Sequence, residues 1–427
     1  MDFQAVKGTR DFYPDEMRLR NWIVDAWRRV SLRNGFEEYD SPIFEYLDLF
    51  TAKSGQEIAG QLFSFTDRGG RSLAIRPEIT PALARMVNAR VNALPRPIKW
   101  FSAPRLCRAE NPQKGRLREF FQWNIDVIGS DDTLADAECI FTAVDFLREV
   151  GLAPTDVQVR IGSRPLTVAA LKASGVTDDK IDPALAVLDK RAKIEDAEFV
   201  RLAKAAGLSD SQIDSARRFQ DCPACADVGN LLEGVEGVAA AVANLQELLS
   251  RLSVMGAAEY CKLDLGVVRG LAYYTGVVYE VFDAGQSLRA IAGGGRYDNL
   301  LQVLGGPALG ATGFGMGDVV LGILLAEKGK LPALGGQLDF FVIDAEGTFE
   351  KALAVVGALR GKGLSADFSY KRQAIGKQFK QASQRGAKFA AIIEPDGGVT
   401  VKDLTAGTQT KRGLDEFLAE PVARAKQ

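Results

Sequence analysis

Arginine, tyrosine and glycine residues cluster in two neighbouring segments of the sequence. The segments GVVRGLAYYTGVVYEVF and GGGRYD contain, beside short turns, Arg269, Tyr273, Tyr274, Arg296 and Tyr297. Glycine lets the backbone approach a ligand closely, and arginine can bind a phosphate or a carboxylate through two parallel hydrogen bonds. Tyrosine adds a flat wall with a polar tip. The cluster indicates a pocket for a small polar molecule, although a β-hairpin with half-buried tyrosines would need the same residue types.

Two further segments, IRPEIT and RLCRAENPQKGRLREFFQWNID, carry charge that a core would not tolerate unpaired. In the first, the carboxylate of Glu78 could bind an ammonium group at a strand-to-helix loop, with Thr80 beside it. In the second, Arg108 and Glu110 are expected to share one face of a strand, because alternate residues of a strand point the same way. The same rule groups four residues on the return strand: Phe120, Gln122, Asn124 and Asp126. This arrangement indicates a polar pocket, with a solvated sheet face as the alternative.

The composition limits the chemistry. The chain contains no histidine, which excludes an imidazole base, a Ser-His or Cys-His nucleophile and a histidine metal ligand. Five cysteines are too sparse for a disulfide framework, and Cys222 with Cys225 forms a single CxxC where tetrahedral zinc needs four ligands. The reaction must therefore rely on arginines, carboxylates, amides and metal-bound phosphate.

The elements that must position these residues follow an α+β pattern. A chain of 427 residues is long enough for two or three domains. The first third predicts an amphipathic helix, a hairpin, a second helix and two long antiparallel strands rather than repeated βαβ units. The ranges are 15–34 for the first helix, 81–91 for the second and 98–128 for the strand pair.

Changes in composition predict the domain boundaries. A helical insertion is expected at about 165–255, where Ala, Leu, Lys and Asp dominate. The Gly/Pro/Lys stretch at 329–337 indicates a linker, so that 1–328 forms one domain. Residues 338–427 alternate strands and helices, which predicts a small α/β domain.

The last 90 residues are more basic than the rest of the chain. Residues 338–427 contain 14 Lys and Arg against 11 Asp and Glu, whereas the whole chain has a net charge of −2. Clustered positive charge beside strands is typical of contact with a nucleic-acid backbone, and a solvated helix face explains part of it. The start of the sequence is acidic and mixed, without the pattern of a signal peptide, and the chain has no apolar run near 18 residues. A cytoplasmic location is expected.

Taken together, the motifs resemble those of class II aminoacyl-tRNA synthetases, and specifically the histidyl-tRNA synthetases. KGTRDFYPDE and SPIFEYLDLF resemble the N-terminal segment and the dimer-forming first motif, and RLCRAENPQKGRLREFFQ resembles the second. RGLAYYTG and GGGRYD resemble the two histidine-specific motifs, and ATGFGMGD the third class II motif. The resemblance implies an α+β catalytic domain with an antiparallel sheet and a helical insertion, followed by an α/β anticodon-binding domain.

The implied reaction is ATP-dependent activation of histidine, followed by transfer to the 3′ end of tRNA(His), in a homodimer that uses ATP and Mg²⁺. The amino-acid carboxylate is already ionised at neutral pH, so no general base is needed. By resemblance, Arg108 holds the α-phosphate of ATP, Arg269 contacts it from the opposite side, and both are catalytic. Glu110 meets the adenine amino group, Arg116 the terminal phosphate, and the ring of Phe120 stacks on adenine.

The resemblance assigns the ammonium group of the substrate histidine to Glu78 and Thr80, with help from Gln122. The imidazole is assigned to Tyr274 and to Asp126, whose carboxylate suits a ring that donates an N–H. The remaining residues predicted to bind histidine are Tyr273 and Tyr297. Contacts with tRNA are predicted for Asn111, Gln113, Lys371, Arg372, Lys377 and Lys380.

The sequence departs from the family pattern at several motif positions. Val320 stands where the third motif usually has an arginine that stacks over adenine, and Ala272 stands where many relatives have aspartate. These departures leave a second interpretation open: the regulatory subunit of ATP phosphoribosyltransferase, a synthetase-like protein that senses histidine without charging tRNA. Such paralogues usually lack the anticodon-binding domain, which residues 338–427 supply here. Another class II synthetase would not account for RGLAYYTG.

Overall fold

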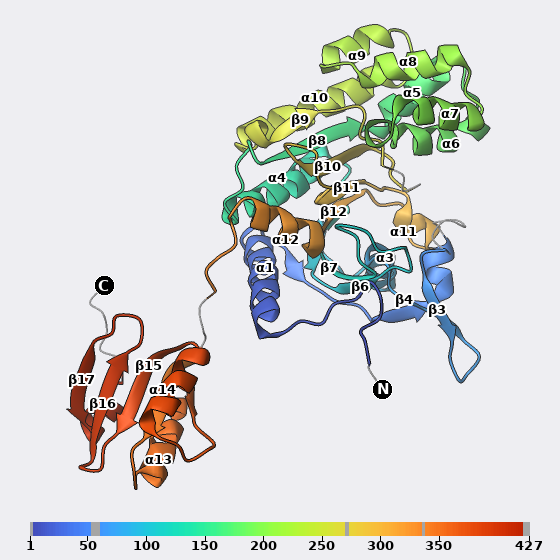
Figure 1. The fold of residues 1–427 in the computed structure, drawn as a ribbon. Helices are drawn as coiled ribbons and strands as arrows, with labels where there is room; N and C mark the ends of the chain where they lie inside the picture. The colour runs from blue at the N-terminus through green and yellow to red at the C-terminus, as the bar shows by residue number, and fades with distance from the viewer. Residues whose placement is uncertain (1–2, 53–59, 270–272, 335–337, 422–427) are drawn as a thin grey trace. The chain divides into compact units, whose positions relative to one another are not determined.

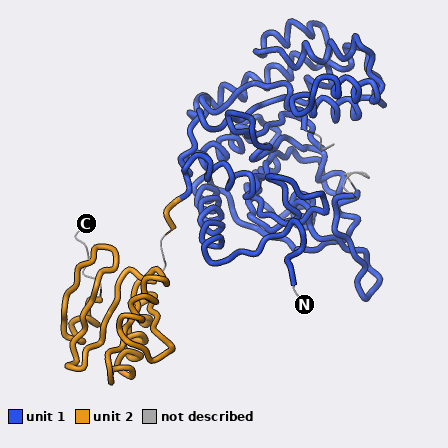
Figure 2. The backbone as a smooth tube through the Cα atoms, viewed as in Figure 1, with its two compact units in different colours: residues 1–331 blue, residues 332–427 orange. Residues whose placement is uncertain are grey.

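The computed structural model describes residues 3–52, 60–269, 273–334 and 338–421. The chain forms two compact units, Met1–Leu331 and Pro332–Gln427 (Figure 2). Among the described residues, no helix is both long enough and apolar enough to cross a membrane. Ala272, one of the departures from the family motif, lies outside the described residues.

Unit 1 is built on a nine-stranded sheet with the order β1-β5-β7-β12-β11-β10-β8-β9, and β6 pairs with β7 (Figure 1). Neighbouring strands are antiparallel except the edge pairs β1–β5 and β8–β9, which are parallel. The predicted α+β class is confirmed, and the sheet is mixed because a long crossover connection joins β1 to β5 and another joins β8 to β9. The strands are β1 (Glu37–Glu38), β5 (Ile98–Ser102), β6 (Arg105–Cys107), β7 (Glu119–Ile128), β8 (Val157–Ser163), β9 (Cys261–Leu263), β10 (Val277–Asp283), β11 (Ala292–Arg296) and β12 (Ala311–Gly317).

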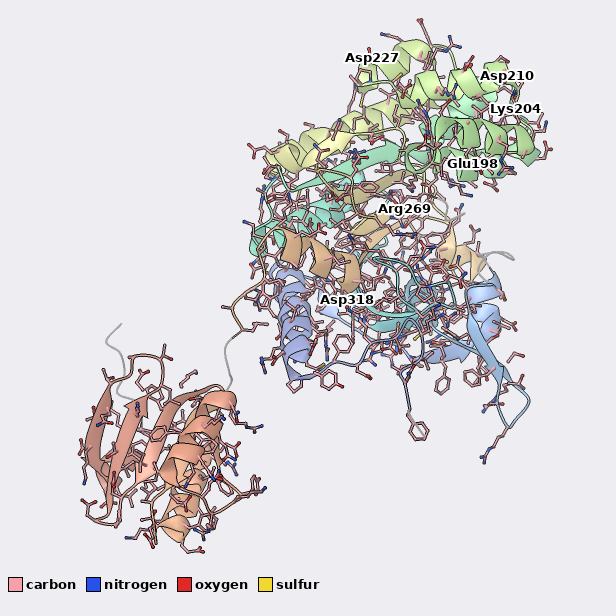
Figure 3. The ribbon with its side chains drawn as sticks, viewed as in Figure 1. Glu198, Lys204, Asp210, Asp227, Arg269 and Asp318 are labelled. Atoms are coloured by element: carbon pink, nitrogen blue, oxygen red, sulfur yellow. The ribbon has the colours of Figure 1, made fainter. Side chains whose placement is uncertain are left out.

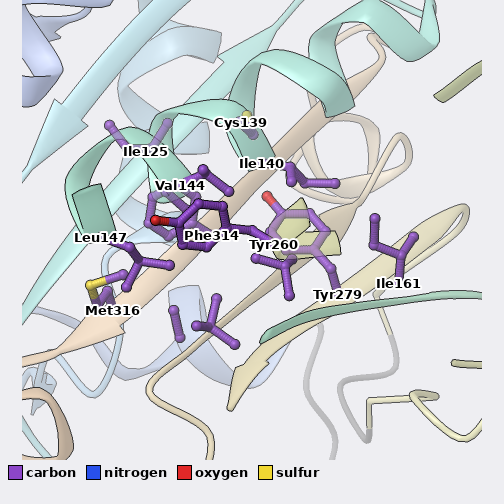
Figure 4. Close-up of a cluster of buried hydrophobic side chains, with 14 of the residues drawn as sticks. Ile125, Cys139, Ile140, Val144, Leu147, Ile161, Tyr260, Tyr279, Phe314 and Met316 are labelled. Carbon is purple, nitrogen blue, oxygen red and sulfur yellow. The ribbon is translucent and has the colours of Figure 1, made fainter. Parts of the chain in front are cut away.

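One face of this sheet carries the main hydrophobic core. Helices α1 (Pro14–Arg33) and α4 (Thr133–Glu149) contribute buried side chains to it. Trp27 of α1 stacks on Trp123 of β7 with ring centroids 6.2 Å apart. Figure 4 shows Val144 and Leu147 of α4 beside Phe314 of β12. Because β7 sends alternate residues into this core, its other residues point to the opposite face of the sheet.

A small antiparallel sheet precedes the second helix. It has the order β2-β4-β3, with β2 (Phe44–Tyr46), β3 (Phe63–Thr66) and β4 (Ser72–Ile75). The hairpin of β3 and β4 confirms the prediction for this segment, and α3 (Thr80–Arg90) lies within one residue of the predicted helix.

The strand pair predicted at 98–128 is wrong in its first half, residues 98–110, where one continuous strand was expected. The segment forms two strands, β5 and β6, separated at Ala103 and Pro104. Proline has no backbone N–H and interrupts a hydrogen-bonded ladder. Arg108 and Glu110 follow the end of β6, so the alternation rule does not place their side chains.

Six α-helices fill the chain between β8 and β9 and gather beside these two strands (Figure 1). They have a hydrophobic core of their own, which includes Leu185, Phe199 and Ile213. This stretch is called the helical segment below. Its helices are α5 (Arg164–Ala173), α6 (Asp178–Leu188), α7 (Asp196–Ala205), α8 (Asp210–Gln220), α9 (Cys225–Leu231) and α10 (Val238–Val254).

Unit 2 is an α/β fold around a five-stranded sheet with the order β14-β13-β15-β16-β17. The predicted alternation of strand and helix is present as far as β16, but β17 and α15 were not predicted. β17 is a polar and largely exposed edge strand, held by backbone pairing, so it lacks a hydrophobic pattern. The elements are β13 (Leu338–Asp344), α13 (Phe349–Gly361), β14 (Ala366–Phe368), α14 (Ile375–Gln384), β15 (Ala387–Ile393), β16 (Gly398–Asp403), β17 (Gln409–Gly413) and α15 (Leu414–Ala419).

Candidate active site

Two adjoining cavities lie on the face of the nine-stranded sheet opposite the main core. The larger has a volume of about 780 Å³ and the smaller about 250 Å³. Both cavities are lined by Arg108, Arg116, Gln122, Arg269, Gly293 and Gly315. Three arginines therefore stand where the two cavities meet, a position suited to an anionic group shared between two ligands.

The glycines of β11 and β12 make room for polar side chains on this face. A Cβ atom on Gly293 would overlap the guanidinium of Arg269, and one on Gly313 would overlap the carboxylate of Asp126. A Cβ atom on Gly315 would lie 2.7 Å from Cδ of Gln122. The glycines of these motifs therefore leave room for neighbouring side chains as well as for a ligand.

Arg269 is held from several sides. Its backbone is left-handed, with φ at 54°, a conformation that non-glycine residues rarely adopt. Its backbone N–H donates to Oδ1 of Asp189 over 3.0 Å, and its Nη1 lies 3.6 Å from Oε1 of Glu280. The guanidinium carbon lies 5.4 Å from the ring centroid of Tyr274. Burial lowers the pKa of Arg269, but Tyr274, Glu280, Tyr273 and Asp189 together raise the pKa above its ordinary value, so the side chain is a permanent cation.

The smaller cavity brings together all seven residues predicted to bind histidine: Glu78, Thr80, Gln122, Asp126, Tyr273, Tyr274 and Tyr297. The hydroxyl of Tyr273 donates to Oε2 of Glu78 over 3.2 Å. Oε1 of Glu78 is buried and has no hydrogen-bond partner among the described residues. Glu78 thus offers an acceptor to a ligand that carries an N–H group.

Asp126 is the deepest charged group of this cavity, with 3% of its surface exposed. The hydroxyl of Tyr297 donates to its Oδ1, while its Oδ2 is buried without a partner in the described part of the chain. Burial raises the pKa of Asp126 to about 7, and the hydrogen bond from Tyr297 acts in the opposite direction. A buried acceptor with one oxygen unsatisfied favours a ligand that donates a hydrogen bond there.

Four of the five residues predicted to bind ATP line the larger cavity: Arg108, Arg116, Phe120 and Arg269. The fifth, Glu110, is not among the described residues that line it. Arg108 donates from Nε to the backbone oxygen of Pro77 over 3.0 Å, and its guanidinium carbon lies 5.3 Å from the centroid of the Phe120 ring. Arg116 forms an ion pair with Glu110. The structure thus pairs two residues that the resemblance assigns to opposite ends of ATP.

The start of α12 (Asp318–Glu327) contributes an apolar side chain to the lining of this cavity. Val320 lines it, and a Cβ atom on Gly115 would lie 3.2 Å from Cγ2 of Val320. Asp318, labelled in Figure 3, fixes the helix start by accepting from the backbone N–H of Phe121 over 2.9 Å and from Arg10 over 2.6 Å. The third-motif position is therefore well anchored but carries no cation.

The expectation that Arg296 lies beside a ligand is wrong. Its guanidinium is buried and donates to Oδ2 of Asp136 over 2.6 Å and to the backbone oxygens of Ser130 and Asp132, each over 3.0 Å. On β11, Gly293 faces the cavities, and a residue three positions further along the strand points to the other face. Arg296 ties β11 to the start of α4.

The residues predicted to contact tRNA lie in two separate places. Asn111 and Gln113 are exposed in the turn after β6, where Gln113 pairs with Arg116 through backbone hydrogen bonds of 2.9 Å. The other four lie in unit 2 and are all exposed: Lys371, Arg372, Lys377 and Lys380. The guanidinium carbon of Arg372 lies 3.3 Å from the ring centroid of Phe349.

Glu280 and Asp189 also line the larger cavity, and neither was predicted from the sequence. Glu280 is a buried carboxylate in the middle of the apolar strand VVYEVFD, and a charge in such a strand is a signal that could have revealed it. Asp189 has no comparable signal, because acidic residues at helix ends are common in the helical segment.

Comparison with known proteins supports the motif resemblance over the whole chain. A family model described as histidyl-tRNA synthetase matches residues 8–317, and one described as an anticodon binding domain matches residues 331–423. The histidine–tRNA ligase of Opitutus terrae is 44% identical over 416 residues, which cover 96% of this chain and 95% of that protein. The chloroplastic/mitochondrial histidine–tRNA ligase of Arabidopsis thaliana is 39% identical over 422 residues, covering 98% of this chain and 86% of that protein.

Solved structures of related proteins have the same fold as this chain. The histidyl-tRNA synthetase of a Nostoc species superposes with a TM-score of 0.83 at 25% identity, covering 99% of this chain and 100% of that one. A Bacillus halodurans protein titled an ATP phosphoribosyltransferase regulatory subunit/histidyl-tRNA synthetase superposes with a TM-score of 0.75 at 23% identity, covering 91% of this chain and 98% of that one. The second likeness shows the shared fold alone.

Proposed function

We propose, since the chain belongs to the histidyl-tRNA synthetase family and is a histidine–tRNA ligase, that the two adjoining cavities form its site for making histidyl-adenylate. The class II family uses ATP, and the ligase reaction takes histidine and tRNA(His) as substrates. Histidine then occupies the smaller cavity and ATP the larger. The observation that carries this proposal is the buried, partly unsatisfied carboxylate of Asp126, which lines the smaller cavity.

In this proposal the two ends of histidine bind to opposite carboxylates. The imidazole N–H donates to Oδ2 of Asp126, and Tyr297 keeps the other oxygen occupied. The ammonium donates to Glu78, supported by Thr80 and Gln122. An analogue whose ring cannot donate would leave Asp126 unpaired, and a site built in this way rejects such an analogue strongly.

The activation step needs alignment and charge neutralisation. The ionised carboxylate of histidine attacks the α-phosphorus of ATP, an O–P bond forms, and the bond to pyrophosphate breaks. Arg108 and Arg269 bind the α-phosphate as its negative charge shifts, a role that their position in the lining of both cavities supports. Phe120 offers a ring for adenine. A hydroxyl at the 3′ end of tRNA then attacks the carbonyl of the adenylate, and AMP leaves.

Magnesium is best treated as part of the ATP substrate. The described residues contain no group of three or more acidic or cysteine side chains arranged to hold a metal ion. Mg²⁺ commonly keeps several waters and binds through substrate phosphates with one or two carboxylates. Glu280 is the buried carboxylate of the larger cavity, and Arg269 already neutralises it in part.

We extend the proposal to the domains and their tRNA contacts. Residues 1–328 form the catalytic domain with the helical insertion at about 165–255, and 338–427 form the anticodon-binding domain after a linker at 329–337. The ends of both the linker and the last domain lie outside the described residues. Contact with tRNA is proposed at Asn111 and Gln113 for the acceptor end, and in the last domain at Lys371, Arg372, Lys377 and Lys380.

We also propose a cytoplasmic homodimer. The support is an exposed apolar surface around the small three-stranded sheet, in the segment that resembles the dimer-forming motif. Phe44 and Tyr46 of β2 are exposed, as are Ile43 before it and Phe65 of β3. Exposed apolar groups of this kind are typical of protein interfaces. A monomeric mass in solution at micromolar concentration would contradict the dimer.

The experiment that tests the proposed site is histidine-dependent ATP–pyrophosphate exchange, followed by charging of tRNA(His). Wild-type protein should catalyse both, and the Arg269→Ala variant should lose exchange. Full exchange by Arg269→Ala would remove Arg269 from the reaction. Absence of exchange in the wild type would favour the histidine-sensing regulatory function, which no observation on this chain favours at present.

A further inference from the structure

We propose that Asp189, at the end of α6 in the helical segment, is a positioning residue for Arg269. The helical segment, and not the catalytic sheet alone, would then hold the backbone of Arg269 in its left-handed conformation. The inference rests on the proposed role of Arg269 at the α-phosphate. No other part of the proposed mechanism assigns Asp189 a role.

The contact is specific and uses both carboxylate oxygens. Oδ1 of Asp189 accepts from the backbone N–H of Arg269 over 3.0 Å, and Oδ2 lies 3.0 Å from Nζ of Lys193. Asp189 directly follows α6 as its C-terminal cap residue. Lys193 also belongs to the helical segment, so this segment orients the carboxylate that reaches Arg269.

The packing of Val268, the residue before Arg269, also supports a role of the helical segment in holding Arg269. Val268 is fully buried in the hydrophobic core of the helical segment, with Leu185 of α6 among the members of that core. Val267, one residue earlier, belongs instead to the cluster of the catalytic unit that contains Tyr274. The chain thus crosses from the catalytic core to the helical segment just before Arg269.

The side chain of Arg269 returns to the catalytic sheet. It lies near Glu280 of β10 and over the ring of Tyr274, in the space that Gly293 leaves open. Figure 3 shows Arg269 between the sheet strands and the helical segment. The backbone of this residue is therefore fixed by one subdomain and its guanidinium by the other.

This division has a mechanical consequence. A left-handed backbone is unfavourable for arginine, so it persists only where its surroundings hold it. Without the bond to Asp189, the backbone can relax towards the right-handed region, which redirects the side chain. A displacement of about 1 Å of a group that aligns a reaction can lower the rate by about 100-fold. Movement of the helical segment would act on Arg269 through the same bond.

The test compares four variants of the full-length enzyme in histidine-dependent ATP–pyrophosphate exchange. Asp189→Ala removes the acceptor, and we expect kcat to fall by about 10- to 150-fold, the effect of losing a hydrogen bond to a charged group. The KM for histidine should stay unchanged, because Asp126 and Glu78 are untouched.

Asp189→Asn keeps an oxygen acceptor and should recover most of the rate. Asp182→Ala, an exposed position on α6 that pairs with Arg164, is the matched control and should behave as the wild type. Arg269→Ala completes the set.

The outcomes separate the two proposals. If Arg269→Ala loses exchange while Asp189→Ala keeps wild-type kcat, the positioning role is overturned and the proposed site stands. If Arg269→Ala keeps exchange, the proposed role of Arg269 fails first. Equal loss in Asp189→Ala and Asp189→Asn would show that the acceptor geometry is not what matters, and would also overturn the inference. If circular dichroism shows that Asp189→Ala does not fold, the exchange activities of Asp189→Asn and Asp189→Glu are compared instead. The positioning role requires more activity in Asp189→Asn, because the longer side chain of glutamate displaces the acceptor.

Discussion

Replacing Asp126 by asparagine should impair the recognition of histidine while leaving ATP binding intact. The side chains have nearly the same shape, but the carboxylate has two acceptor oxygens and the amide has one. Tyr297 already donates to Oδ1, and Oδ2 is the oxygen without a partner. In the variant, either the hydroxyl of Tyr297 or the imidazole N–H must face the amide NH₂ group, so one of the two acceptors is lost.

The magnitude follows from the lost hydrogen bond. A hydrogen bond to a charged group contributes about 1.5–3 kcal/mol, and leaving a buried donor unpaired costs a similar amount. Because each 1.4 kcal/mol corresponds to about a factor of ten, kcat/KM for histidine should fall by roughly 10- to 150-fold. The KM for ATP should stay within about twofold of the wild type, since Asp126 lines only the smaller of the two cavities.

The pH dependence provides an independent check of the same carboxyl group. Burial raises the pKa of Asp126 to about 7, so the group loses its charge and one acceptor as the pH falls through that value. The kcat/KM for histidine in the wild type should therefore decrease below about pH 7, because kcat/KM reports ionisations of the free enzyme and free substrate. Free histidine titrates near 6.5 as well, and Asp126→Asn serves as the control because it keeps only the inflection of the substrate. Identical pH profiles for the two proteins, or an unchanged kcat/KM in the variant, would refute the assignment of Asp126 to the imidazole.

Four other predictions test the remaining parts of the structure. Gly293→Ala should lower kcat of pyrophosphate exchange by about 100-fold, because its Cβ would displace the guanidinium proposed to bind the α-phosphate; Gly322→Ala, where a Cβ meets open space, is its control and should have no effect. Arg296→Met should lower the free energy of unfolding by about 3–5 kcal/mol by leaving a buried carboxylate unpaired, measured by chemical denaturation, while KM values of the folded protein stay the same; a large rise in KM without loss of stability would restore a ligand-binding role. Lys377→Glu combined with Lys380→Glu should weaken tRNA charging and leave pyrophosphate exchange unchanged, and equal loss in both assays would contradict contact with tRNA in the anticodon-binding domain. Chelation of Mg²⁺ should stop exchange without a change in melting temperature, whereas a clear drop in melting temperature would indicate a resident metal site.

The sequence allowed the polar face of β7 to be predicted because a strand has a fixed period of two. Gln122 and Asp126 share a cavity for that reason, and the apolar residues between them enter the core. The rule failed at Glu110, where Pro104 had already ended the first strand and the chain had left the ladder after β6.

Partners distant in the sequence could not be predicted. Arg296 has the same local motif signals as Arg269, yet its partner Asp136 lies 160 positions earlier and on the other face of the sheet. Asp189 reaches Arg269 across 80 positions and from a different subdomain. Such pairings depend on how the layers pack, and a helix-capping aspartate carries no local mark of its distant contact. The function was predicted from the motif resemblance. Only the structure shows that Arg269 lines the cavities, whereas Arg296 joins β11 to α4.

Recognition of the imidazole by Asp126 can be measured as the rate of histidine-dependent ATP–pyrophosphate exchange in wild-type protein and in Asp126→Asn. The two substrates are histidine and an analogue whose ring carries no N–H donor. We expect exchange by the wild type with histidine, a loss of at least about tenfold with the analogue, and little discrimination between the two compounds in the variant. Equal exchange with both compounds in the wild type would show that Asp126 does not recognise the imidazole, and would contradict the proposed histidine site.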